Sequence, residues 1–385
     1  MQINDLLKDT VDAEASDLHL TAGIKPTIRV WGKLQALEAY DVLTPEDTSQ
    51  LAYSMLNAFQ KQKFEKSWEL DLSYGVRGLG RFRVNLYRQR GATGVAIRTI
   101  PSTIPAIEEL NLPPILKELT RKPRGFVLVT GPTGHGKSTA LAAMLDAINS
   151  ERSCHIVTVE DPIEYLHMHK KSIVNQRELS FDTQSFPNAL RGVLREDPNV
   201  VMIGEMRDLE TISAALTIAE TGHLVFATLH TANAAQSIDR IVDVFPPYQQ
   251  QQIRIQLSAV IEAILSQQLL TNQRYLAARS SGGRVGTLRR AVSTTSSATM
   301  SKVWPTIEEV GRVPAVEVMI ATPAIRNLIR EAKTHQIESA IQTGAQYGMQ
   351  TMDMALADLY RRQLISFEDA LARAIHPDEL KKMIV

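Results

Sequence analysis

The sequence predicts an α/β protein, with a small α+β domain at the N-terminus and a larger α/β domain after it. From about residue 121 onward, short apolar strands rich in β-branched residues alternate with helical stretches, a pattern typical of a mainly parallel sheet. Between the first of these strands and the first helix lies a glycine-rich motif that runs from Gly131 to Ser138. That position is where parallel α/β folds bind phosphate groups.

The glycine-rich motif follows the pattern G-x-x-x-x-G-K-[ST]. Its three glycines allow the backbone to curl so that successive N–H groups point at phosphate oxygens, and the positive end of the following helix adds to the attraction. A glycine-rich turn with a solvated lysine is disfavoured, because a strand precedes the motif and a helix follows it. We expect ATP to bind at Gly131, Pro132, Thr133, Gly134, His135, Gly136, Lys137, Ser138 and Thr139.

Two residues of the motif carry specific chemistry. Lys137 is expected to neutralise charge on the transferring phosphoryl group, and the Ser138 hydroxyl to ligate Mg²⁺. The expected cofactors are therefore ATP and Mg²⁺.

The chain divides into four expected regions. Helices mixed with short alternating strands predict the α+β domain over residues 1–100, with one helix near 45–64. Four prolines indicate a linker over 101–120. The ATPase domain is expected over 121–320, with strands at 126–130, 155–159, 200–203, 224–229 and 313–320, and a helical region follows over 321–385. Within the ATPase domain, residues 272–310 are basic and rich in Ser and Thr, which predicts an insertion.

Carboxylates follow two of the predicted strands. Glu160, Asp161 and Glu164 come after the second strand, and Glu205 comes after the third. The carboxyl ends of parallel strands converge beside the phosphate loop, where a carboxylate can hold Mg²⁺ through water or activate the attacking water. Because Gly204 occupies the place where many nucleoside triphosphatases carry an aspartate, Glu205 is expected to take over that role and to hold Mg²⁺ through water. A purely structural ion-pair role stays open for the carboxylates after the second strand.

Histidines bracket the fourth strand. His230 follows it, and we expect this side chain to donate to the γ-phosphate and sense its presence. For His223, before the strand, a packing or inter-subunit role is as plausible.

Composition excludes several classes of protein. Lys plus Arg equals Asp plus Glu, 42 each, so net charge does not favour nucleic acid as a partner. The single cysteine excludes an internal disulfide framework and a multi-cysteine zinc site. No apolar run approaches the roughly 18 residues of a membrane helix, and no signal peptide is apparent. We therefore expect a cytoplasmic protein.

Four motifs follow one another along the chain: the phosphate loop, the carboxylates after the second strand, Glu205 after the third strand, and the histidines around the fourth. In this order they resemble the secretion ATPase superfamily of type II secretion (the type II secretion system protein E family) and type IV pili. The stretch from Leu194 to Asp208 is similar to the signature around that superfamily's Walker B strand. The stretch from Ala324 to Glu331, AIRNLIRE, is similar to a motif of the type IV pilus retraction ATPases, the PilT family. The likeness begins at Ser16 and fails only across about 272–310. The loop departs from the usual family sequence at His135, where serine is common.

The resemblance implies a homohexameric ATPase with a PAS-like N-terminal domain and a RecA-like motor domain. ATP turnover would drive pilus retraction, and with it twitching motility, against an inner-membrane platform protein. The ring would associate peripherally with the inner face of the cytoplasmic membrane and bind no nucleic acid. The resemblance also implies catalytic roles for Glu164, Glu205, Lys137 and His230, and for arginines that reach the nucleotide of a neighbouring subunit, here Arg83 and Arg98, with Arg81 as a further candidate.

Several alternatives stay open. An assembly or export ATPase of the same superfamily is disfavoured, because those enzymes generally carry a four-cysteine zinc element. An accessory retraction paralogue is disfavoured by the intact motif from Ala324 to Glu331. A hexameric nucleic-acid translocase would share the RecA-like core, but the neutral charge and the lack of an aromatic-basic groove argue against it. A nucleotide-binding scaffold without catalysis could dispense with Glu164 and Glu205.

Overall fold

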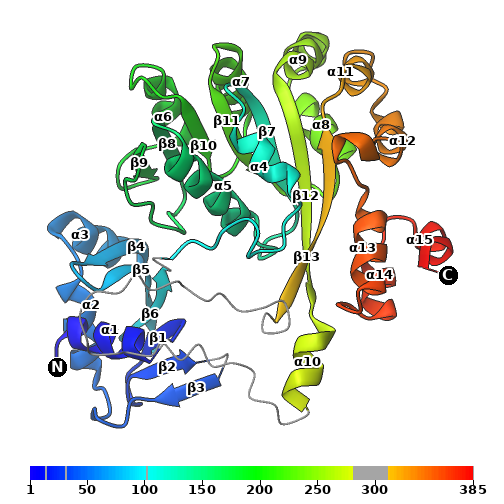
Figure 1. Ribbon diagram of the computed structural model, residues 1–385. Coiled ribbons are helices and arrows are strands. Elements are labelled where there is room, and N and C mark those ends of the chain that lie inside the picture. Colours follow the sequence, from blue (N-terminus) through cyan, green and yellow to red (C-terminus); the bar gives the residue numbers. More distant parts are fainter. Residues whose placement is uncertain (14, 31–32, 101–102, 281–310, 385) are drawn as a thin grey trace. The chain divides into compact units, whose positions relative to one another are not determined.

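The computed structural model describes residues 1–385 except for 14, 31–32, 101–102, 281–310 and 385 (Figure 1). Its contacts divide the chain into two units. The first consists of Met1–Thr103 and Pro162–Leu166, and the second of Ile104–Asp161 and His167–Val385. Each unit is built on its own sheet, so the predicted α/β class with two sheets is confirmed.

The first unit contains an antiparallel sheet in the order β3-β2-β1-β6-β5-β4. Alternate residues of these strands point into a core of leucine, isoleucine, valine and phenylalanine side chains, and helices complete that core. The elements are α1 Ile3–Asp12, β1 Asp17–Leu20, β2 Thr27–Val30, β3 Lys33–Ala36, α2 Pro45–Ser54, α3 Ala58–Ser67, β4 Glu69–Val76, β5 Gly80–Gln89 and β6 Ala92–Ile100.

The single helix expected near 45–64 is wrong, because the structure has two helices there. The first helix ends at Ser54, and Asn57 caps the second, α3. The Asn57 side chain accepts a hydrogen bond from the Gln60 N–H at 2.8 Å, and the Gln60 side chain accepts one from the Asn57 N–H at 3.0 Å. This reciprocal cap satisfies donors that a helix start leaves free. The Asn-x-x-Gln spacing was present in the sequence as a sign of a second helix start.

The second unit contains a sheet in the order β13-β12-β7-β11-β10-β8-β9. All neighbours are parallel except the edge strand β13, which pairs antiparallel with β12. The five expected strands are present, and β9 and β12 were not foreseen. The strands are β7 Gly125–Thr130, β8 His155–Glu160, β9 Ile173–Glu178, β10 Val200–Ile203, β11 Leu224–Leu229, β12 Ile261–Thr271 and β13 Arg312–Ile320.

Both faces of this sheet are covered, which is why its central strands are apolar without alternation. In β7, Phe126 and Leu128 face one core, whereas Val127 and Val129 face the other. The first core includes α6 Phe186–Val193, α7 Leu209–Glu220, α8 Ala234–Asp243, α9 Pro247–Val260, α11 Pro323–Arg330 and α12 Ile337–Gln342. The second includes α4 Ile115–Thr120 and α5 Lys137–Glu151.

The proline-rich stretch between the two units is packed over most of its length. Ile107, Leu112, Leu116 and Leu119 are buried beneath α5 in the second core. These four residues explain why the second unit begins at Ile104.

The C-terminal helices form a smaller cluster against the far end of the β12–β13 pair. The helices α13 Met352–Arg361, α14 Phe367–Arg373 and α15 Pro377–Ile384 bury their apolar side chains against Leu270, Val313 and Ala315. Part of the expected insertion is helix α10, Gln273–Ser280, and the expectation for 281–310 lies outside the described residues. Among the described residues, no helix is both long and apolar enough to cross a lipid bilayer.

Candidate functional site

The glycine-rich loop joins β7 to α5 and has the backbone shape its sequence predicts. Gly131, Gly134 and Gly136 have φ of +136°, +79° and +82°, a region that other residues enter at a cost. At Gly131, a side-chain Cβ would also lie 2.2 Å from the carbonyl oxygen of Gln267. Glycine at this position is therefore required both by conformation and by close approach of β12.

Lys137 folds back over the loop. Its Nζ donates hydrogen bonds to the carbonyl oxygens of Gly131 at 2.8 Å and of Pro132 at 3.0 Å, and the residue is only 8% exposed. Helix α5 begins at Lys137 and has no acidic residue in its first turn. Ser138 and Thr139 follow in that turn and are half-buried. An ammonium group and free helix N–H groups thus share one edge of the sheet, a combination that binds anions.

A carboxylate and a histidine face this loop from neighbouring strands. Glu205 follows β10, and its Oε1 lies 3.1 Å from His230 Nε2. His230 follows β11, and its Nδ1 lies 3.5 Å from both Lys137 Nζ and Thr133 Oγ1. These three elements come together because β10, β11 and β7 are adjacent parallel strands that end at the same edge.

Glu205 is ionised in this setting. The other carboxylate oxygen accepts a hydrogen bond from Arg207 at 2.7 Å, and this bond lowers the pKa of Glu205. Partial burial acts in the opposite direction, and the charges of Arg207, His230 and Lys137 lower the pKa further. The structure therefore places a negative oxygen close to the phosphate loop.

Contacts at Gly204 explain why the carboxylate stands one position later than in many nucleoside triphosphatases. A Cβ at Gly204 would lie 3.2 Å from both the Glu160 Cα and the Val159 carbonyl oxygen of β8. The Gly204 N–H donates to that same Val159 oxygen at 2.8 Å, and the Thr228 hydroxyl donates to the Gly204 carbonyl oxygen. The backbone is thus held between β8 and β11, and the side chain is left to Glu205.

The carboxylates after β8 are dispersed. Glu160 is buried, and its Oε1 accepts hydrogen bonds from Thr158 Oγ1 at 2.6 Å and from Gln176 Nε2 at 3.1 Å. Asp161 is exposed. Glu164 is also exposed and lies in the segment Pro162–Leu166, which belongs to the first unit. Within one unit, the structure therefore joins Glu205, but not Glu164, to the phosphate loop.

The expected arginines also lie in the first unit, where neighbours engage at least one of them. Arg83 is exposed and stands opposite Arg98 in the β5–β6 pairing. Arg98 Nε donates to Asp17 Oδ1 at 3.0 Å. Burial alone would raise the pKa of Asp17, but hydrogen bonds from Ser16 and Arg98 and the charge of Arg98 lower it. Arg98 thus has a role inside this sheet.

His223 contacts neighbouring residues of its own unit, which fits a packing role. Its Nδ1 lies 2.9 Å from the Ile218 carbonyl oxygen and 3.1 Å from Thr221 Oγ1, at the end of α7.

Three residues that contact this loop or its carboxylate were missed as site residues from the sequence. Gln267 Nε2 donates to the His135 carbonyl oxygen at 2.9 Å, and Arg312 Nη1 lies 3.4 Å from the Gly134 carbonyl oxygen. Both come from the β12–β13 pair, more than a hundred positions along the chain, so no local pattern marks them. Arg207 stands in the Walker B signature but was not assigned to the site.

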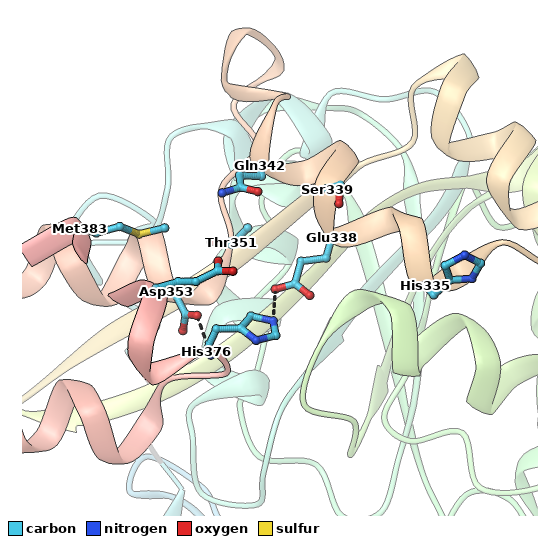
Figure 2. Close-up of a pocket in the computed structure, with 9 residues that line it drawn as sticks. His335, Glu338, Ser339, Gln342, Thr351, Asp353, His376 and Met383 are labelled. Atoms are coloured by element: carbon cyan, nitrogen blue, oxygen red, sulfur yellow. Dashed lines mark hydrogen bonds and ion pairs between the residues drawn. The ribbon is translucent and has the colours of Figure 1, made fainter. Parts of the chain in front are cut away.

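A separate cavity of about 130 Å³ is lined by residues of the segments 335–342, 351–353 and 376–383 (Figure 2). Figure 2 shows His376 turned toward Glu338, with 2.9 Å between Nε2 and Oε1. Asp353 accepts hydrogen bonds from the N–H groups of Ile375 and His376, each at 2.8 Å. No residue of the phosphate loop lines this cavity, and ligand sites usually exceed about 300 Å³. It is not a nucleotide site.

The chain matches known proteins over almost its whole length. Residues 82–365 match the family described as type II/IV secretion system protein. The chain is 47% identical to the type IV pilus retractation ATPase PilT of Pseudomonas aeruginosa over 378 residues, which are 98% of this chain and 99% of PilT. It is 44% identical to a twitching motility protein of Neisseria gonorrhoeae over 92% of this chain and 86% of that protein.

A solved structure agrees with these matches. The crystal structure of the pilus retraction motor PilT with bound ADP aligns with a TM-score of 0.85 and 46% identity, over 99% of both chains. The match includes both units, the phosphate loop and the strands that carry Glu205 and His230. This chain therefore belongs to the type II/IV secretion system protein family and, within it, to the PilT family of type IV pilus retraction ATPases.

Proposed function

We propose that this protein is a motor that hydrolyses ATP to retract type IV pili. One observation carries the proposal: Lys137, His230 and Glu205 converge on a glycine-rich loop at one edge of a parallel sheet, in a chain 47% identical to a PilT over nearly its full length. Loop, lysine and carboxylate are the parts that phosphoryl transfer requires.

Lys137 and the start of α5 hold the phosphates. The Lys137 ammonium is now bound to the carbonyl oxygens of Gly131 and Pro132. Phosphate oxygens are stronger acceptors than neutral carbonyls, so the ammonium is expected to turn toward the β- and γ-phosphates. There it neutralises charge that develops on the transferring group.

Ser138 and Glu205 fit a magnesium ion bound together with ATP. Magnesium usually takes few protein ligands and completes its shell with phosphates and water, and a hydroxyl in the first turn of α5 with an ionised Glu205 suits that role. When bound, the ion supplies charge that stabilises the leaving and transferring oxygens. In the described residues, no group of three or more His, Cys, Asp or Glu could hold a metal by itself.

His230 connects the carboxylate to the loop. Its Nε2 is 3.1 Å from Glu205 and its Nδ1 is 3.5 Å from Lys137 and Thr133. We propose that His230 donates to the γ-phosphate and so reports whether ATP or ADP is bound. We also propose that Glu164 orients the attacking water, and that Arg83 and Arg98 act on the nucleotide of a neighbouring subunit in a homohexamer.

The motor would work on the inner face of the cytoplasmic membrane, against a platform protein of the pilus. The protein would be cytoplasmic and would bind no nucleic acid. Rotation of one unit against the other during turnover would supply the force.

Two variants test the site. Lys137→Ala is expected to lose ATP binding and turnover, because the charge over the loop is removed. Glu205→Gln is expected to bind ATP with near-normal affinity but to hydrolyse it roughly 100-fold more slowly, since the acidic oxygen is lost. Lys381→Ala, which removes an exposed lysine paired with Asp378 far from the loop in the sequence, serves as the matched control.

Calorimetry with ATP and a phosphate-release assay separate binding from hydrolysis, and both are run with and without DNA. Pilus retraction is then measured in cells that carry each variant in place of the wild-type gene. Near-normal hydrolysis in both site variants contradicts the assignment of the site. Turnover that rises on adding DNA, or normal retraction without the protein, contradicts the retraction motor.

A further inference from the structure

Strands β12 and β13 contact the phosphate loop at two of its residues, Gly134 and His135. Gln267 Nε2 donates to the His135 carbonyl oxygen at 2.9 Å, the Leu269 N–H donates to His135 Nδ1 at 3.1 Å, and Arg312 Nη1 lies 3.4 Å from the Gly134 carbonyl oxygen. His135 stands between two glycines with positive φ. The side chain of His135 therefore fixes a stretch of backbone to which the two glycines would otherwise allow several conformations.

The bond to Leu269 fixes the chemical state of the imidazole. A backbone N–H can only donate, so His135 Nδ1 must accept, and the ring proton must sit on Nε2. A protonated ring carries hydrogen on both nitrogens. Protonation would then set two donors against each other and break the bond to β12.

The groups around His135 keep it neutral at ordinary pH. Burial is the main cause that lowers its pKa, and positive charges on Arg373 of α14, Lys137 of α5 and Arg312 of β13 add to it. The contacts from β12 come from Gln267 and Leu269, which do not titrate.

We propose that His135 is a positioning residue for the nucleotide: its neutral imidazole ties the phosphate loop to β12, and protonation releases that tie and weakens nucleotide binding. The inference rests on the proposed function, because the ligand is taken to be ATP or ADP. The contact matters because the N–H groups that face phosphate must be oriented before binding, and a loop that has to be ordered by its ligand binds less tightly.

Two substitutions separate the tie from the size of the side chain. His135→Asn places an amide oxygen near the position of Nδ1, so it retains an acceptor but cannot titrate near neutral pH. His135→Leu has a similar volume and no acceptor. At pH 7.5, we expect the asparagine variant to bind ADP within about two-fold of wild type and the leucine variant roughly five-fold more weakly, as one lost hydrogen bond implies.

The decisive measurement is the pH dependence of that affinity in the full-length protein. Calorimetry with ADP is run from pH 7.5 to pH 5, together with melting temperatures that show each variant is folded. Free ADP titrates in the same way in all three experiments. The ratio of the dissociation constants of wild type and variants at each pH therefore isolates the effect of His135. Wild type is expected to fall toward the leucine variant below pH 6.5, while His135→Asn keeps its advantage.

The outcomes distinguish this inference from the proposed function. Equal affinities of His135→Leu and wild type at pH 7.5, or the same loss at low pH in His135→Asn as in wild type, overturn the role of His135. If the wild-type protein binds no ADP at pH 7.5, the proposed nucleotide site itself is wrong.

Discussion

Glu317 is a carboxyl group inside the second unit, only 2% exposed, and burial raises its pKa to about 7. Its Oε1 accepts a hydrogen bond from the Ala234 N–H at 2.7 Å. Contacts with the Met352 backbone and the Ser266 side chain lower the pKa, and the nearby Glu338 raises it, but burial dominates. Because Ser266 also accepts a hydrogen bond from Thr130 at 2.9 Å, Glu317 is linked to the strand that leads into the phosphate loop.

Glu317 makes stability depend on pH in a defined direction. The folded protein keeps this proton up to about pH 7, whereas the unfolded chain releases it near 4.5. Unfolding then releases a proton between these values, so the contribution of Glu317 is fully present below pH 4.5 and is lost as the pH rises to about 7. Glu317→Gln retains the acceptor without the charge, so we expect it to melt several degrees above wild type at pH 8 and close to wild type at pH 4.5. Thermal unfolding at both pH values checks this, and an equal difference at both would contradict it.

At the scale of single residues, local sequence patterns were enough to predict those site residues that belong to a recognisable motif. Lys137, Glu205 and His230 follow strands that were recognisable in the sequence, and the structure brings their side chains together. Asn199, just before β10, contacts the neighbouring strand β8: its Oδ1 accepts a hydrogen bond from the His155 N–H at 2.8 Å. Gln267 and Arg312 could not be predicted, since they approach the loop only through the pairing of β12 with β7 and β13.

Helix α11 contains most of the AIRNLIRE motif, and its residues divide between core and surface. Ile325 and Ile329 are fully buried against the sheet. Arg326 binds the end of α9: its Nη1 donates to the carbonyl oxygens of Ser258 at 2.8 Å and Ala259 at 2.9 Å. Its Nη2 lies 2.7 Å from Glu262 Oε1 on β12. A cation at a helix C-terminus satisfies free carbonyl groups and opposes the helix dipole.

Arg326→Ala is therefore expected to lower the free energy of unfolding by about 2 kcal/mol, because several charge-assisted hydrogen bonds are lost together. Arg330→Ala is the matched control: it removes the same charge from the same helix at an exposed position and is expected to change stability by less than about 0.5 kcal/mol. Chemical denaturation of both variants measures the difference. Equal losses would show that Arg326 contributes only its charge.

Elements were predictable where their sequence carried a strong signal. The buried strands β7, β10 and β11 are continuous apolar runs, and the structure confirms them. Strand β12 was missed because it follows α9 without a break at Val260 and contains Ser266, Gln267 and Gln268. Those polar residues are suited to a strand that borders the phosphate loop rather than to a dry core.

The first unit carries a complete core of its own, so residues 1–103 are expected to fold alone. Its six described strands pair with one another, and Leu18, Phe64, Phe82 and Val84 are among its fully buried side chains. A fragment of residues 1–103 should unfold in one cooperative thermal transition, followed by circular dichroism. A gradual change without a transition would show that the second unit, or the segment 162–166, is needed for folding.

For the molecule as a whole, the sequence indicated a phosphate-binding α/β unit preceded by a smaller one, and the structure has two sheets in two units. The sequence did not indicate that Pro162–Leu166, including Glu164, belongs to the first unit. A segment joins a unit far away in the sequence through contacts that leave no periodic pattern in the chain. For the same reason, the order of the seven strands had to come from the structure.

The antiparallel pairing of β12 and β13 runs from Ala263 and Ile320 to Thr271 and Arg312, and the Asn272 N–H donates to the Gly311 carbonyl oxygen at 3.1 Å just beyond it. The ladder is therefore closed by residues on either side of positions 273–310. Since the entropy of closing a loop grows only slowly with its length, relatives can gain or lose residues there without shifting the register of the ATPase sheet. A fluorescent reporter grafted between residues 281 and 310 would exploit the same tolerance and allow the protein to be followed in living cells.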